Sequence, residues 1–330
     1  MSIRNRTELK AQAREALAAA ESPKKLFFLY ISVSVGISLL CALLNFLLNM
    51  GMTAFTGLEG ITARSLLQTL QSLLETASSL ALPFWQFGLI FLTLQLVRGR
   101  AVAPGTLLEG FRQLGPAVRL YLLKTLIMIG AAIGSIYAVS LLLVLTPLAN
   151  LMLANMGSLP EAETEEEIMQ LMQDPAVMKQ MFSAMLPLML VMLAAMLAVL
   201  IPIFYRLRMT DYVLMDHPEA GARNAIRTSW HMMKGNCMSL FMLDLSFWWF
   251  ALLELLLSAV YMLGTFLPLP IHSAVYFFLC IVLYSIGIVA LHTWAGPQVQ
   301  TTYAAAYEAL QAKYYRPAPI EIPTWEDLQN

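Results

Sequence analysis

Charged residues are scarce in this chain, and their scarcity excludes a water-soluble fold. Asp, Glu, Lys and Arg make up 12% of the 330 residues and hydrophobic residues make up 59%, against about 25% and 45–50% in soluble domains. The formal net charge is -1, so no basic surface for nucleic acid is expected. The composition is typical of a polytopic membrane protein.

Cysteine and recognisable catalytic motifs are also missing or few. The three cysteines, Cys41, Cys237 and Cys280, are widely spaced and form no Cys-x-x-Cys, so neither a disulfide framework nor a zinc site is predicted. The chain has no His-Glu-x-x-His, Gly-x-Ser-x-Gly, Walker or dinucleotide-binding motif. We therefore expect no metal and no cofactor, and we rank a membrane enzyme behind two non-enzymatic functions.

Long apolar runs predict the fold class. About 20 apolar residues are needed to cross roughly 30 Å of hydrocarbon, and backbone amides in lipid must be paired within their own segment, which requires helices. Pro83, Pro187 and Pro202 lie inside such runs and are expected to kink or interrupt their helices. We predict an all-α bundle of six transmembrane helices at Leu26–Met50, Ser78–Val97, Val118–Leu145, Met181–Tyr205, Leu240–Leu263 and Ser273–Thr293.

A short phrase recurs at the start of three of these runs. It occupies Leu26–Tyr30, Leu120–Lys124 and Leu240–Asp244, and each copy opens with Leu and ends on a polar residue. The pattern predicts one membrane domain over residues 1–330 that contains three two-helix repeats. We place the repeats at about 7–97, 105–205 and 218–293, and a C-terminal cytoplasmic tail at 294–330.

The distribution of cations predicts the orientation. All but two of the 20 Lys and Arg fall on the side that holds both termini, and the exceptions are Arg64 and Lys179. By the positive-inside rule the N- and C-termini are cytoplasmic.

Two segments on the cytoplasmic side have the periodicity of amphipathic helices, at 7–21 and 218–234. In the second, Ala222, Ile226, Trp230 and Met233 form an apolar stripe beside a basic one. A basic face at the membrane surface is attracted to anionic lipid. The alternative is a helix that packs on the inner rim of the bundle. The lipid-headgroup candidates are Arg223, Arg227, His231 and Lys234.

Polar groups inside the apolar runs are the other candidate site, because such groups are costly in lipid and are retained for a reason. One interpretation is that Lys124 and Asp244 pair with each other, near Tyr30, while Glu254 bonds Asn45 or Gln86. The other is a proton path through Asp244 and Glu254. The full set of intramembrane candidates is Tyr30, Asn45, Gln86, Lys124, Asp244, Glu254 and His292.

Several phrases resemble one bacterial family. These are Ala225–Asn236 with Leu243–Phe247, then Leu107–Phe111, and Thr302–Tyr307. Through them the chain resembles the integral membrane proteins grouped as domain of unknown function nine-seven-five. The resemblance implies a bacterial cytoplasmic-membrane protein without an assigned activity, so it carries no functional residues over.

The leading interpretation is a non-enzymatic membrane protein that organises lipid or a membrane partner. The alternative is a small permease that uses Asp244 and Glu254. A cavity that reaches either carboxylate favours the permease, and a fully packed bundle favours the organising role.

Overall fold

The computed structural model describes residues 5–54, 60–145, 175–266 and 273–314. Helices make up all the regular structure in these ranges, with no β-strand among them, which confirms the all-α class. Four helices of the described chain are long and apolar enough to cross a membrane, and the number rises to six if each of two bent helix pairs is one span. The first three lie in α2 (Pro23–Ala54), α3 (Gly60–Val97) and α5 (Leu114–Leu145), and the fourth begins within α8 (Pro175–Leu207).

The chain divides into two compact units. The first comprises Met1–Tyr121 and Met209–Asn330, and the second comprises Leu122–Arg208, with most of α5 and all of α8. α3 continues through Pro83, and α8 continues through its internal prolines, so these residues do not interrupt their helices. The arrangement of the three predicted repeats about a common axis stays a prediction.

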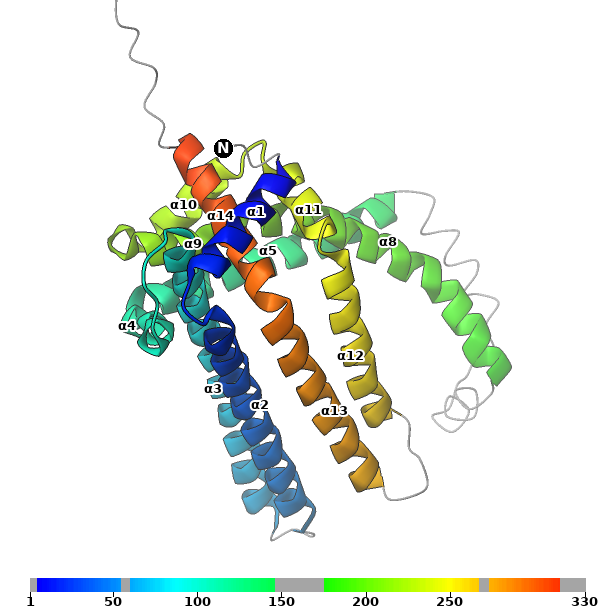
Figure 1. Ribbon diagram of the computed structural model, residues 1–330. Coiled ribbons are helices and arrows are strands. Elements are labelled where there is room, and N and C mark those ends of the chain that lie inside the picture. The colour runs from blue at the N-terminus through cyan, green and yellow to red at the C-terminus, as the bar shows by residue number, and fades with distance from the viewer. Residues whose placement is uncertain (1–4, 55–59, 146–174, 267–272, 315–330) are drawn as a thin grey trace, which may run out of the picture. The chain divides into compact units, whose positions relative to one another are not determined.

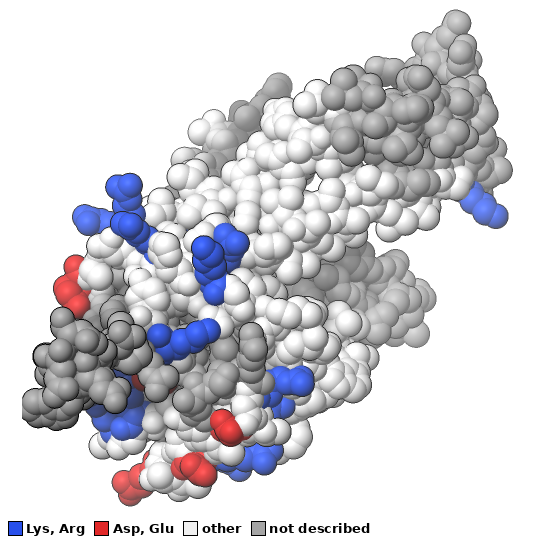
Figure 2. Space-filling view, turned by 90° about the horizontal axis from the view of Figure 1, so that it is seen from above, with Lys and Arg blue, Asp and Glu red and all other residues white. Residues whose placement is uncertain are grey.

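Within the first unit, long helices extend from one side of a layer of shorter helices (Figure 1). Seen from above, which is the side of the layer opposite to the long helices, Lys and Arg side chains are scattered over the surface among Asp and Glu (Figure 2). The long helices are α2, α3, α12 (Trp248–Phe266) and α13 (Ser273–Trp294). The layer contains α1 (Arg6–Ala19), α9 (Thr210–Asp216), η2 (Pro218–Ala220), α10 (Gly221–Met232), α11 (Cys237–Leu245) and α14 (Gly296–Tyr314).

The pairing of α2 with α3 forms a well-packed hydrophobic core. Tyr30 stacks on Trp85 with ring centroids 5.6 Å apart, and the Trp85 indole Nε1 donates to the Tyr30 carbonyl at 3.0 Å. Burial of large apolar side chains stabilises this pair, at about 1.5–3 kcal/mol for each fully buried one. The buried members of the core are Leu26, Phe27, Trp85, Leu89, Leu92, Leu96 and Leu107.

A short helical turn, η1 (Pro104–Leu108), and α4 (Glu109–Arg112) pack against α3 through glycine contacts. A Cβ on Gly88 of α3 would overlap the backbone oxygen of Leu107, and one on Gly110 would lie 2.5 Å from the Phe84 carbonyl. Only glycine permits this backbone approach.

Helix α14 lies in the segment that the sequence places in a cytoplasmic tail. It packs against α1 and α3, and Ala304, Ala305 and Ala306 are fully buried. Small side chains permit such close packing of helices. Residues 296–314 are therefore part of the core of the first unit.

The sequence predicts one continuous helix over Leu240–Leu263, and the structure breaks it. α11 and α12 meet at an angle of 61°. The Ser246 hydroxyl bonds the Leu243 carbonyl at 2.6 Å, and the Phe247 amide bonds the Asp244 carbonyl at 2.9 Å. The Ser246 amide still bonds the Met242 carbonyl four residues back, but the Phe247 amide bonds three residues back, and the Ser246 hydroxyl occupies the Leu243 carbonyl that Phe247 would otherwise use.

Two cations from α1 stabilise the end of α11. Arg6 donates to the Met242 carbonyl at 3.3 Å, and Lys10 donates to the Ser246 carbonyl at 3.1 Å. Cations are favourable at helix C-termini because the last carbonyls lack intrahelical partners. Burial lowers the pKa of Lys10, and the charges of Arg14 and Arg6 lower it further.

Candidate functional site

A histidine and a glutamate join the two long helices α12 and α13. Nε2 of His292, in the last turn of α13, lies 2.8 Å from Oε1 of Glu254, near the middle of α12. The imidazole also packs edge-on against Phe250, with ring centroids 5.2 Å apart. The sequence interpretation paired Glu254 with Asn45 or Gln86, and the structure pairs it with His292 instead. The two residues meet because α12 packs beside the C-terminal end of α13. The sequence alone does not show this packing.

A cavity of about 370 Å³ is lined by His292 of this pair. Its size lies at the lower end of the range for small-molecule sites, about 300–1,000 Å³. The walls come from α2, α3, α13 and α14, and nearly half of the lining residues are polar. Those are Tyr30, Ser34, Gln86, His292 and Gln300, and the apolar ones are mainly Phe27, Ile31, Leu82, Pro83 and Leu89.

Two irregularities of the helices lie at the cavity wall. Pro83 in α3 removes one backbone donor and one helical hydrogen bond. On another wall, α13 ends at Trp294 and α14 starts at Gly296, with a 50° bend between them. Gly296 itself lines the cavity. Discontinuous helices at cavities are typical of ligand sites in transporters, because irregular backbone in a membrane is tolerated only where it is buried or lines a cavity.

The structure therefore brings four of the seven intramembrane candidates together. Tyr30, Gln86 and His292 line the cavity, and Glu254 bonds one of them. Asn45 lies elsewhere on α2, and its Oδ1 is buried without a hydrogen-bond partner in the described part of the chain.

The remaining two candidates belong to different units. Asp244, in the first unit, accepts a hydrogen bond from the Tyr303 hydroxyl at 2.6 Å. Lys124 belongs to the second unit. The expected contact between Lys124 and Asp244 stays a prediction.

Helix α10 carries all the lipid-headgroup candidates except Lys234, which follows it. Arg223, Arg227, His231 and Lys234 are all exposed. On the apolar stripe, Ala222 and Met233 are buried, and Ile226 and Trp230 are half-buried. Because the protein itself covers much of this stripe, the burial favours the alternative, a helix packed on the rim of the unit, over a helix inserted into lipid.

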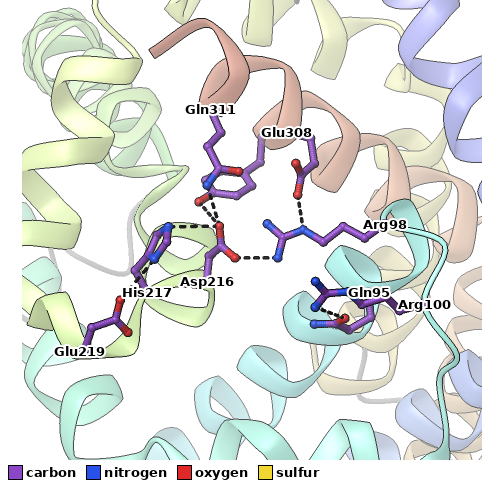
Figure 3. Close-up of polar contacts among 9 residues, drawn as sticks. Gln95, Arg98, Arg100, Asp216, His217, Glu219, Glu308 and Gln311 are labelled. Atoms are coloured by element: carbon purple, nitrogen blue, oxygen red, sulfur yellow. Dashed lines mark hydrogen bonds and ion pairs between the residues drawn. The ribbon is translucent and has the colours of Figure 1, made fainter. Parts of the chain in front are cut away.

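A polar network that the sequence interpretation missed connects α3, α9 and α14 (Figure 3). The Arg98 guanidinium donates through Nη1 to Oδ1 of Asp216 and through Nε to Oε1 of Glu308, both at 2.7 Å. Oδ2 of Asp216 accepts from the Tyr307 hydroxyl at 3.1 Å and from Nε2 of Gln311 at 2.8 Å.

The electrostatics of this network favour its charged form. The hydrogen bond to Asp216 raises the pKa of Arg98; burial opposes the rise and Glu308 adds to it. The Asp216 side chain is only 8% exposed, yet both of its oxygens have partners. Nε2 of His217 lies 3.6 Å from Oδ2 of Asp216, and Nδ1 of the same ring lies 3.3 Å from Oε1 of Glu219. Because the network of Arg98, Asp216, Tyr307, Glu308 and Gln311 connects three helices, we call it the Arg98 clamp.

Weak signals for the network are present in the sequence. Arg98 forms an Arg-x-Arg pair with Arg100, and both enter the sequence prediction only through the distribution of cations that sets the orientation. Tyr307 ends the phrase Thr302–Tyr307. Asp216 gives no local signal, because its partners lie 118 and 91 residues away in sequence.

The described residues contain no group of three or more His, Cys, Asp or Glu that is able to hold a metal ion. Comparison of the sequence with models of known protein families identifies the family of this chain. The family model described as "Protein of unknown function (DUF975)" matches residues 1–314, so the chain belongs to that family. No curated protein and no solved structure matches it.

Proposed function

We propose that this member of the DUF975 family is a non-enzymatic membrane protein that binds a small ligand among its helices, as a small permease does. The observation that carries the proposal is the polar cavity at His292, whose imidazole bonds Glu254 at 2.8 Å. Glu254 is not among the described residues that line this cavity and contacts it only through His292, so the support for a permease over a fully packed bundle is the polar cavity itself. Asp244, the other carboxylate of the permease interpretation, accepts from Tyr303 and is not among the residues that line this cavity.

The lining indicates the class of ligand. The lining combines hydroxyl, amide and imidazole groups with aliphatic and aromatic ones. The carboxylate of Glu254, outside the lining, already pairs with His292, a side chain that carries a positive charge when protonated. Charge-balanced lining of this kind suits a small molecule with an apolar body, several hydrogen-bonding groups and no net charge.

The organisation of lipid or of a membrane partner is a second candidate function. It is favoured by the exposed cations at and just after α10, Arg223, Arg227, His231 and Lys234. Each cation near an anionic leaflet contributes about 1 kcal/mol of attraction. The burial of Ala222 and Met233 within the protein argues for surface contact rather than insertion.

A bacterial cytoplasmic membrane with both termini in the cytoplasm completes the proposal. The proposal is supported by the excess of Lys and Arg in the segments that the sequence places on one side of the membrane. Single cysteines at Arg227 and Glu165 test it, the second lying outside the described residues. A membrane-impermeant maleimide on intact cells should label position 165 and reach position 227 only after permeabilisation. The reverse pattern would refute the orientation.

Thiol accessibility tests the cavity itself. In a variant with the native cysteines Cys41, Cys237 and Cys280 replaced, Ser34→Cys places a thiol on the cavity wall. A matched control, Ser38→Cys, lies one turn further along α2 and is exposed outside the cavity lining.

The permease proposal predicts that a charged, water-soluble methanethiosulfonate labels Ser34→Cys in membranes and spares Ser38→Cys, since thiols in lipid do not ionise. Protection of Ser34→Cys from both faces of the membrane would overturn the proposal in favour of a dry bundle. Mass spectrometry of small molecules that co-purify with the wild type but not with a Gln86→Leu variant then identifies the ligand class.

A further inference from the structure

A second hollow lies on another face of α2 and differs from the cavity in chemistry. It is a groove of about 600 Å³ between α2 and α13. Its lining is apolar except for one cation and two hydroxyl residues. The residues are Lys24, Phe28 and Val35 from α2, and Ser285, Ile286, Val289, Ala290, Thr293 and Trp294 from α13. Neither His292 nor Glu254 lines it.

The groove is apolar along most of its length. The Ser285 hydroxyl bonds the Ile281 carbonyl of its own helix at 2.7 Å, so it offers little polarity to an occupant. Phe28 and Ile286 are more than half exposed. Exposed apolar side chains are common on the long helices of this chain, and these two line a concave surface that suits an apolar occupant.

The length of the groove matches one leaflet of a bilayer. From Lys24 to Val35, the lining of α2 covers 12 residues, and the 11 steps between them span about 16 Å at 1.5 Å per step. The hydrocarbon core of a bilayer is about 30 Å thick, so the groove has the depth of a single leaflet that starts at Lys24.

The two ends of the groove differ in charge. Lys24 lies at the start of α2, and Trp294, at the end of α13, is 68% exposed at the same end. Trp favours the membrane–water interface, and Lys near the interface attracts anionic headgroups. Among the described residues, Lys24 is the only charged one in the lining.

We propose that this groove binds an anionic phospholipid, with an acyl chain between α2 and α13 and the phosphate at Lys24. The site goes beyond the cavity and its proposed ligand, because it shares no lining residue with the cavity. Failure of one proposal therefore leaves the other standing.

Native mass spectrometry of the full chain in mild detergent tests the headgroup. We expect phosphatidylglycerol to be retained about fivefold over phosphatidylcholine of the same acyl chains, which corresponds to about 1 kcal/mol for one cation. Lys24→Gln should remove the preference. Lys25→Gln, at a neighbouring exposed position outside the lining, should keep it. Equal retention of both lipids by the wild type, or equal effects of the two variants, would overturn the proposal.

A second pair of variants tests the acyl chain. Ala290→Trp fills the groove and should lower retention of both lipids, whereas Ala251→Trp on an exposed face of α12 should not. In membranes, a photo-crosslinking residue at Ile286 should capture lipid. Capture of another segment of this chain, or of a second copy, would show that protein fills the groove and would refute the lipid site.

Discussion

The guanidinium of Arg98 and the carboxylate of Asp216 lie 2.7 Å apart, although 118 residues separate them in sequence. Through this pair the end of α3 is held against the end of α9, and Glu308 and Gln311 extend the connection to α14. Removal of one partner from a buried pair is costly because the other charge stays in the interior without compensation. The layer of short helices therefore depends on a polar clamp as well as on apolar packing.

We predict that Arg98→Ala lowers the free energy of unfolding by about 3 kcal/mol, the lower end of the range for a broken buried pair. The lower end applies because Tyr307 and Gln311 still donate to Asp216 and because Arg98 is 23% exposed. Denaturant unfolding in detergent measures the change.

Arg100→Ala is the matched control for this prediction. Arg100 is exposed and its guanidinium bonds Gln95 at 3.3 Å, so its loss should cost less than about 0.5 kcal/mol. Equal losses for the two arginines would contradict the clamp. Arg98→Lys should fall between the wild type and Arg98→Ala, since a single ammonium does not reproduce the forked geometry of the guanidinium.

Gly88→Ala should be among the most damaging small substitutions. Its Cβ would overlap the Leu107 carbonyl, and that atom belongs to the backbone of η1 rather than to a flexible side chain. Overpacking of this kind costs about 1–3 kcal/mol or more. We expect a lower melting temperature and faster proteolysis near residues 104–112.

Gly36→Ala on α2 provides the control, because among the described residues no atom outside the adjacent turns of its own helix lies within 4 Å of its ideal Cβ. Alanine is favoured over glycine in a helix by about 0.5–1 kcal/mol, so stability should stay unchanged or rise. A Gly88→Ala variant as stable as Gly36→Ala would show that η1 is free to move.

The helical class follows from the sequence because apolar runs of membrane length admit only one common secondary structure. Local breaks were harder to predict. The bend between α11 and α12 depends on Ser246, whose hydroxyl competes with the helix, and on Arg6 and Lys10, which reach it from α1. Hydropathy reports the total apolarity of Leu240–Leu263 and is insensitive to a single serine.

The candidate site was predictable as a set of residues but not as a set of partners. Tyr30, Gln86, Glu254 and His292 are candidates because polar groups in apolar runs are costly. Of these, Tyr30, Gln86 and His292 line the cavity, and Glu254 bonds His292 from outside the lining. Glu254 was assigned the wrong partner because the contact depends on how α12 and α13 pack. The Arg98 clamp was missed because charges outside the apolar runs were interpreted as topology signals alone.

Loss of the His292–Glu254 bond should lower the free energy of unfolding only slightly, and the loss should depend on which side chain replaces Glu254. Glu254→Gln keeps an Oε1 acceptor, so we expect almost no change, whereas Glu254→Leu should cost about 0.6 kcal/mol, the average for a hydrogen bond between membrane helices. His292→Leu should cost a similar amount, and the double variant no more than either single. Thermal unfolding in detergent measures the series, and full additivity would exclude the pair.

The last prediction concerns Asp244. Tyr303→Phe removes the hydroxyl that donates to Asp244 at 2.6 Å. Hydrogen bonds to a charged group contribute about 1.5–3 kcal/mol, so a loss of that order is expected. Tyr137→Phe, at an exposed position, is the control and should be nearly neutral.

The predicted ion pair with Lys124 adds a second expectation. Asp244→Asn should destabilise the protein further if Lys124 is its partner, and Lys124→Met in the same chain should recover part of the loss, because the double variant leaves no unpaired charge in the membrane. The coupling energy of this double-mutant cycle measures the contact directly. A double variant no more stable than the worse single variant would contradict the ion pair. The hydrogen bond from Tyr303 would then be the contact that stabilises Asp244.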